Sequence, residues 1–162
     1  MQRPDPIRPA DDEARALARA LLTAARHAAL AWTDPETGTP GISRIAFGLS
    51  PDGGAITLIS SLASHFAALQ AHPVAAVMLG EPGGKGDPLT HPRLMLRVEA
   101  RFVDRAAPDH ADLRACWLAD HPKSTLYIDF ADFALVRLVP QTALLNAGFA
   151  RASRLTLQDL VP

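Results

Sequence analysis

Two neighbouring stretches of the sequence carry side chains that could bind a phosphate. The first holds Ser43 and Arg44 within an apolar segment. The second ends in hydroxyl and imidazole groups, those of Ser60, Ser61, Ser64 and His65. An arginine can form paired hydrogen bonds with phosphate oxygens, and hydroxyl groups and the free N–H groups of a helix's first turn add further donors. Together these residues predict a site for a phosphate-bearing ligand.

A hairpin followed by a helix would place these groups near one another. The segments 42–49 and 55–60 are typical of β-strands, and a turn sequence at 51–54 separates them. The segment 64–71 has a helical pattern, and Ser64 stands where a helix N-cap is expected. A phosphate would then meet both the strand that carries the arginine and the start of the helix.

The alternation of side chains along the first strand of this hairpin predicts a flat surface beside the arginine. A period of two places Arg44, Ala46 and Gly48 on one face. Because alanine and glycine are small, a planar ring could lie close to the backbone there. The competing interpretation is an arginine on the solvent face of an edge strand.

The remaining pattern predicts a mainly β protein. Helices are expected at 11–26 and 108–119, and further strands at 27–33, 74–79, 93–104, 133–138 and 143–146. We expect a Gly/Pro-rich loop at 81–92, a polar C-terminal tail, and a single domain spanning 1–162 in which residues 1–10 form a flexible leader. Short connections and few crossover helices favour an antiparallel β-barrel with peripheral helices over a doubly wound parallel sheet.

Composition excludes several classes of protein. Hydrophobic residues make up 48% of the 162 residues, and 16 Lys and Arg stand against 17 Asp and Glu, so no basic excess favours nucleic acid or an anionic membrane. No apolar run reaches the roughly 20 residues of a membrane-spanning helix. Cys116 is the only cysteine, and the start of the chain lacks the basic and apolar regions of a secretory signal. These features predict a soluble protein of the reducing cytoplasm.

Other motifs have simpler explanations than catalysis. Lys85 in the glycine-rich loop is followed by Gly86 and then by a strand, whereas a Walker A loop requires Ser or Thr and then a helix. The histidines that precede prolines lack the spacing of zinc ligands, although His91 stands close enough to Arg93 to approach a ligand. Cys116 falls on the apolar face of its predicted helix and is expected in the core. No residue stands out as a general acid or base.

A series of motifs runs in order through most of the chain: residues 41–47 (GISRIAF), 59–65 (ISSLASH), 80–82 (GEP), 84–88 (GKGDP), 91–94 (HPRL), 129–133 (DFADF) and 146–151 (NAGFAR). In this order they resemble the FMN-binding split-barrel proteins related to pyridoxamine 5′-phosphate oxidase, within the subfamily that includes haem-utilisation proteins. The resemblance covers nearly all of the chain after about Arg15.

What the resemblance implies is a homodimer that binds one FMN at each subunit interface. Arg44, Ser64 and His65 would hold the phosphate, and Ser60 and Ser61 would lie near it or near the ribityl chain. The other contacts implied are the backbone of Ile45 and Ala46 against the flavin ring, Arg93 on a neighbouring strand, and Arg151 and Arg154 in the C-terminal region from which the partner subunit reaches the site.

The C-terminal region departs from the family. The oxidases carry an Arg-Leu-His arrangement that helps bind the pyridoxal ring, whereas residues 151–154 read RASR. Without that histidine, oxidation of pyridoxamine phosphate is not expected. The haem-utilisation relatives extend beyond the point where this chain stops, which leaves haem breakdown unassigned. The leading hypothesis is an oxidoreductase that uses FMN on a small-molecule redox substrate. The alternatives are a flavin or haem carrier without turnover, and a haem-degrading protein.

Overall fold

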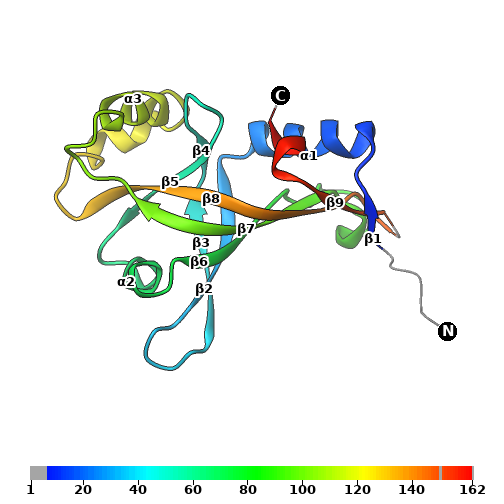
Figure 1. Ribbon diagram of the computed structural model, residues 1–162, viewed down its shortest axis with the longest axis horizontal. Coiled ribbons are helices and arrows are strands. Elements are labelled where there is room, and N and C mark those ends of the chain that lie inside the picture. Colours follow the sequence, from blue (N-terminus) through cyan, green and yellow to red (C-terminus); the bar gives the residue numbers. More distant parts are fainter. Residues whose placement is uncertain (1–6, 150, 162) are drawn as a thin grey trace.

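The computed structural model describes residues 7–149 and 151–161 as a curved β-sheet with helices around it (Figure 1). The strands are β1 (Ile7–Pro9), β2 (His27–Thr33), β3 (Pro40–Ala46), β4 (Gly48–Leu49), β5 (Ala55–Ser60), β6 (Val74–Leu79), β7 (Arg93–Phe102), β8 (Phe133–Asn146) and β9 (Ala152–Leu155). The helices are α1 (Asp12–Ala24), α2 (Ser64–Ala71) and α3 (His110–Asp120), and the short 3-10 helices are η1 (Pro88–Thr90), η2 (Pro122–Leu126) and η3 (Leu157–Leu160). In this described part of the chain, no helix has the length and apolar character needed to cross a bilayer.

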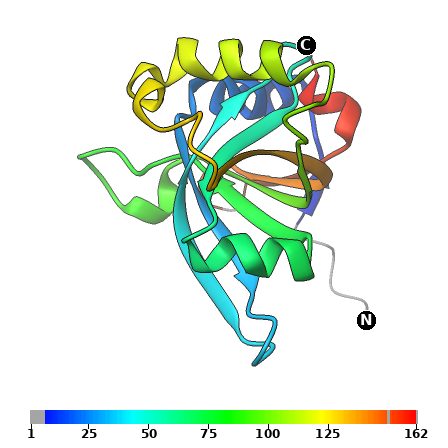
Figure 2. The ribbon, with the colours of Figure 1, turned by 90° about the vertical axis from the view of Figure 1, so that its left-hand side faces the viewer.

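The sheet curls into a split barrel. Its strand order is β1-β9-β8-β7-β6-β2-β3, while β5 pairs with β8 and β4 pairs with β5. The parallel pair is β1 with β9, and the other described ladders are antiparallel. Figure 2 shows α1 and α3 on one side of this curved sheet and α2 on the opposite side. The expected mainly antiparallel barrel with peripheral helices is confirmed.

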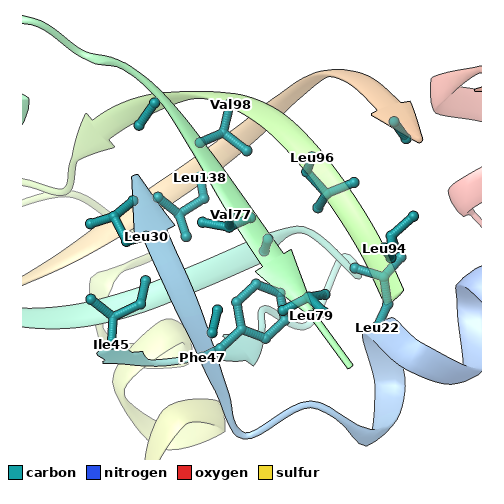
Figure 3. Packing of buried hydrophobic residues seen from close by; sticks show 14 of the residues in the cluster. Leu22, Leu30, Ile45, Phe47, Val77, Leu79, Leu94, Leu96, Val98 and Leu138 are labelled. Atoms are coloured by element: carbon teal, nitrogen blue, oxygen red, sulfur yellow. The ribbon is translucent and has the colours of Figure 1, made fainter. Parts of the chain in front are cut away.

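Aliphatic side chains that alternate along the strands fill the inside of the barrel (Figure 3). Leu94, Leu96 and Val98 of β7 are fully buried, as their alternation predicts. Leu30 of β2 and Val77 of β6 join the same cluster, and the apolar face of α1 packs against it. Fully burying each side chain of this kind stabilises the fold by roughly 1.5–3 kcal/mol. The opposite face of these strands points away from the barrel core.

Helix α3 packs against the β4–β5 hairpin and builds a second apolar cluster. Trp117 is buried there, and its ring lies 3.4 Å from the place that a Cβ on Gly48 would take. The ring also stacks on His121, with 4.1 Å between centroids, and Ala46 packs against the same cluster. The flat ligand surface expected at Ala46 and Gly48 is therefore wrong, because α3 covers Gly48.

Strand β8 is one strand of 14 residues, whereas two separate strands were expected. The reason is a bulge in its pairing with β7. Arg97 faces Thr142, but the next residue of β7 faces Pro140. Gln141 is therefore an extra residue on β8, and the irregularity allows the strand to pass through a proline that would interrupt a regular ladder.

Segments near both ends of the described chain belong to the sheet, contrary to expectation. Residues 7–9, expected in the leader, form β1, and residues 1–6 lie outside the described residues. The expected polar tail contains β9, which pairs with β8 on one side and β1 on the other. Strands this short are decided by the partners they pair with, so the sequence carries little local signal for them.

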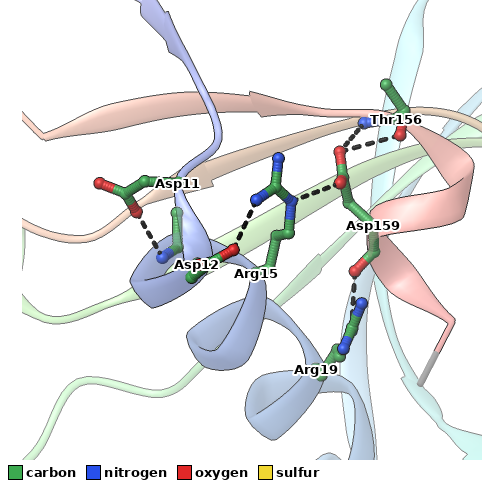
Figure 4. A network of polar contacts seen from close by, with 7 residues as sticks. Asp11, Asp12, Arg15, Arg19, Thr156 and Asp159 are labelled. Carbon is green, nitrogen blue, oxygen red and sulfur yellow. Dashed lines mark hydrogen bonds and ion pairs between the residues drawn. The ribbon is translucent and has the colours of Figure 1, made fainter.

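A polar network fastens η3 to α1 (Figure 4). Arg15 Nε donates to Asp159 Oδ1 at 2.6 Å, and its Nη1 donates to Asp12 at 2.8 Å. Arg19 Nε donates to the backbone carbonyl of Asp159 at 2.9 Å. The hydrogen bond from Arg15, and then those from the N–H and hydroxyl of Thr156, lower the pKa of Asp159 to about 2. The carboxylate is therefore ionised over the physiological pH range.

Candidate functional site

The outer face of the sheet carries a hollow of about 400 Å³ with a low, apolar floor. The floor is formed by Ala29, Ala31, Ala76, Met78, Met95 and Leu144, and Arg93 and Asn146 also line the hollow. Alanine side chains leave the surface of a sheet low, so a planar group could lie flat against it. Ligand sites of this kind combine an apolar lining with a few polar groups that fix orientation.

Strand register sets a row of side chains across this face. Residues that face each other in neighbouring strands point to the same side of a sheet. The row reads Arg44, Ala29, Met78, Met95, Leu144 and Arg154, from β3 to β9. Neighbouring strands lie about 4.8 Å apart, so this row spans about 24 Å across the strands of the sheet. Two predicted site residues, Arg44 and Arg154, are thus the exposed ends of one apolar row.

The imidazole expected beside Arg44 lies on the other side of β3. His65 Nδ1 is 3.1 Å from Ser43 Oγ, which also accepts a hydrogen bond from Trp32 Nε1–H at 3.0 Å. Since Ser43 and Arg44 alternate along the strand, they are attached to opposite faces of it. Burial lowers the pKa of His65 below its ordinary value, so the ring is neutral near pH 7.

The predicted serines surround the exit of β5. Ser60 Oγ donates to Asp132 Oδ2 at 2.6 Å, and the N–H of Ser61 donates to the Asp132 carbonyl at 2.7 Å. Ser64 is the first residue of α2 and not its N-cap, because the extended residue before the helix is Ala63. Alanine has no side-chain acceptor, so the first turn of α2 has no side-chain cap.

The other predicted residues lie away from the hollow. Arg151 Nη2 donates to Glu13 Oε1 at 2.7 Å, near the start of α1. Ile45 is buried in the barrel, and the Ala46 carbonyl accepts a hydrogen bond from Thr57 Oγ1 at 2.6 Å. The structure therefore gathers the other predicted arginines on the outer face, and it gathers the predicted hydroxyl groups at the exit of β5.

Sequence reasoning missed the floor of the hollow. Ala29, Ala31 and Ala76 lie in segments for which the sequence predicted strands and no part in a site. A signal was present, because Ala29 and Ala31 alternate with the larger Leu30 on β2, as Ala76 and Met78 alternate with Val77 on β6. The sequence of such a strand does not by itself show which of its two faces packs against the core.

His91 holds the loop that borders the hollow. The N–H of Gly83 donates to His91 Nδ1 at 3.1 Å, and His91 Nε2 donates to the Lys85 carbonyl at 2.9 Å. Arg93, which lines the hollow, donates through Nη1 to the Leu89 carbonyl at 3.1 Å. Both ring nitrogens of His91 are thus engaged by its own loop.

Two relatives named for haem resemble this chain, one in sequence and the other in sequence and architecture. No protein-family model matches the chain. The chloroplastic non-canonical heme oxygenase HOZ of Arabidopsis thaliana is 31% identical over 115 residues, which are 71% of this chain and 34% of that protein. The solved heme binding protein of Mycobacterium smegmatis is 26% identical with a TM-score of 0.81, over 95% of this chain and 61% of that one. The chain therefore spans less than two thirds of each of these two relatives.

A third solved structure extends the likeness at the level of the fold. It is a Clostridium acetobutylicum protein related to general stress protein 26, described as of the pyridoxinephosphate oxidase family. Its TM-score is 0.67 at 15% identity, over 93% of this chain and 99% of its own. At that identity the likeness concerns the architecture alone.

Proposed function

The chain has the split-barrel fold of the pyridoxinephosphate oxidase family, and on that premise we propose that it binds haem on the outer face of its sheet. The observation that carries the proposal is the apolar hollow with arginines around it. Haem is a flat, apolar ring with carboxylates on one edge, so it needs a low apolar surface and nearby cations. Two of the relatives above 25% identity are named for haem, which favours haem over other planar ligands.

The residues of the hollow fit haem in shape, charge and donor type. The alanines offer an apolar bed, and Arg93 offers a cation beside it. Met78 and Met95 face each other across β6 and β7, and methionine sulfur is one of the ligands that haem iron accepts in proteins. Among the described lining residues there is no His, Cys or Tyr, so the thioethers are the soft donors within reach. Bound haem would supply redox chemistry, and these residues would bind and orient it.

A haem titration followed through the Soret band tests the proposal. Wild-type protein should give a saturable spectral change, and Ala76→Glu should weaken binding about tenfold or more, because it places a carboxylate in the apolar floor. Gln70→Glu adds the same charge on the exposed side of α2 and should bind as the wild type does. Thermal unfolding followed by circular dichroism checks that both variants fold. A wild type that leaves the haem spectrum unchanged refutes the proposal.

The same haem-loaded sample distinguishes a haem carrier from a haem-degrading protein. If bound haem loses its Soret band when a reductant is added in air, the protein degrades haem. If the band persists after reduction, the protein carries or stores it.

A second candidate is FMN bound by an oxidoreductase at a homodimer interface. The observation that favours it is the uncapped first turn of α2, where Ser64 and His65 stand beside the strand that carries Arg44. The N–H groups of such a turn attract phosphate. The exposed side chains of Ile42 and Met78 on the outer face would then be covered by the partner subunit.

Two measurements test this candidate. Titration of FMN should quench flavin fluorescence, and Arg44→Ala should weaken binding about tenfold or more, because it removes a charge-assisted contact. Lys123→Ala, which removes an exposed charge from η2, is the matched control. Light scattering should give the mass of two chains. Unquenched flavin excludes FMN, and a monomer at micromolar concentration contradicts the dimer.

A further inference from the structure

A second hollow adjoins the first on the outer face of the sheet. Its volume is about 380 Å³, and it is lined by Met95 and Leu144, which also line the first hollow, together with Ile7, Arg97, Thr142 and Arg154. Because they share two lining residues, the two hollows form one continuous depression. Its apolar part lies over β2 and β6, and its cationic part lies over β7, β8 and β9.

Strand pairing places the two arginines on opposite sides of β8. Arg97 of β7 faces Thr142, and Arg154 of β9 faces Leu144, two residues further along β8. Both arginines therefore flank one short stretch of β8, and the hydroxyl of Thr142 lies beside them in the same hollow. The bulge at Gln141 comes immediately before Thr142 in β8, and bulges commonly re-aim neighbouring side chains at a site.

The charge of Arg97 is not neutralised within the described residues. Its side chain is exposed and takes part in no ion pair or hydrogen bond with them. The acid nearest to it along the outer face of β7 is Glu99, and this carboxylate is occupied by Arg101 at 3.1 Å. The hollow thus keeps a positive charge that an anionic ligand could meet.

We propose that Arg97, Thr142 and Arg154 form a carboxylate-binding subsite for the acidic edge of a planar tetrapyrrole. This inference rests on the proposed function, since the apolar ring would lie on the alanine floor and its acidic edge would cross Met95 and Leu144. Guanidinium groups bind carboxylates through paired hydrogen bonds, and a threonine hydroxyl adds a donor. The subsite would therefore fix the orientation of the tetrapyrrole ring in the hollow.

The test compares a metal-free porphyrin diacid with its dimethyl ester. Mesoporphyrin and mesoporphyrin dimethyl ester share the same ring, and neither contains iron, so iron ligation contributes nothing. Fluorescence titrations should show that the wild type binds the diacid at least about tenfold more tightly, since hydrogen bonds to charged groups are the stronger ones. Arg97→Gln and Arg154→Gln should each weaken diacid binding about tenfold and leave ester binding unchanged. Thr142→Val should have a smaller effect of the same kind.

The outcomes separate this inference from the function on which it rests. Lys123→Gln, which removes a charge far from the outer face, should change neither affinity. If the wild type binds acid and ester equally well, or if the arginine variants weaken both forms alike, the subsite is refuted and ring binding stands. If the wild type binds neither form, the subsite is overturned, and the haem titration decides the proposed function separately.

Discussion

Replacing His91 with alanine should release the loop that borders the hollow. The imidazole bridges two backbone groups of its own loop, the Gly83 N–H at 3.1 Å and the Lys85 carbonyl at 2.9 Å. A Cβ on Gly83 would lie 2.9 Å from the ring, so the ring and the loop are packed as well as hydrogen-bonded. The same loop accepts a hydrogen bond from Arg93, which lines the hollow.

The magnitude follows from the two hydrogen bonds. Each neutral hydrogen bond contributes about 0.5–1.5 kcal/mol, so closure of the loop should weaken by about 1–3 kcal/mol. Since about 1.4 kcal/mol corresponds to a factor of ten, amide exchange in residues 83–91 should accelerate about 5- to 150-fold. These bonds lie outside the barrel core, so the free energy of global unfolding should change little.

Hydrogen–deuterium exchange read by mass spectrometry measures this effect, with a peptide from β7 as the internal reference. Glutamine is the matched control, because its amide can accept from the Gly83 N–H and donate to the Lys85 carbonyl. His91→Gln should therefore keep the slow exchange of the wild type. Wild-type exchange in His91→Ala would refute the idea that the ring holds the loop. Equally fast exchange in both variants would show that ring packing matters and the two hydrogen bonds do not.

Three further predictions concern stability and titration. Asp159→Asn should destabilise the protein at neutral pH, and its urea midpoint should converge with that of the wild type as pH falls from about 4 to 2, because the folded carboxylate has a pKa of about 2. The NMR titration midpoint of His65 should lie below about 6.5, with the stability from its neutral ring declining as pH falls through that value; a higher midpoint would contradict the burial argument. Leu138→Ala, in the buried core, should cost about 2–5 kcal/mol of unfolding free energy. Leu126→Ala, whose side chain is 77% exposed, should cost less than about 0.5 kcal/mol.

Elements bounded by strong turn signals were predictable from local sequence. The strands 27–33, 55–60 and 74–79 have the bounds expected of them, as does the helix 64–71. Each is short and has glycine, proline or aspartate within two residues of at least one end, and the backbone preferences of these residues act locally. The exceptions are β1, β9 and the continuous β8, where pairing with distant strands outweighs local preference.

The candidate site was only partly predictable. The predicted arginines Arg44, Arg93 and Arg154 do share one face of the sheet, but their common surface lies over Ala29 and Ala76. The expected surface around Gly48 is covered by α3. No pattern within the hairpin could show this, because the helix that covers it follows more than 60 residues later in the chain.

Local chemistry in the chain was sufficient to predict a β-barrel and to single out the arginines that an anionic cofactor would need. Only the tertiary structure decided which of them lie on one surface. Arg44 and Arg154 lie at the two ends of one row of side chains because five successive strand pairings are in register. Each of these pairings depends on side chains that are far apart in the sequence. A shift of one residue in any of these pairings would turn every side chain of that strand to the other face, so the row exists only when the whole barrel has formed.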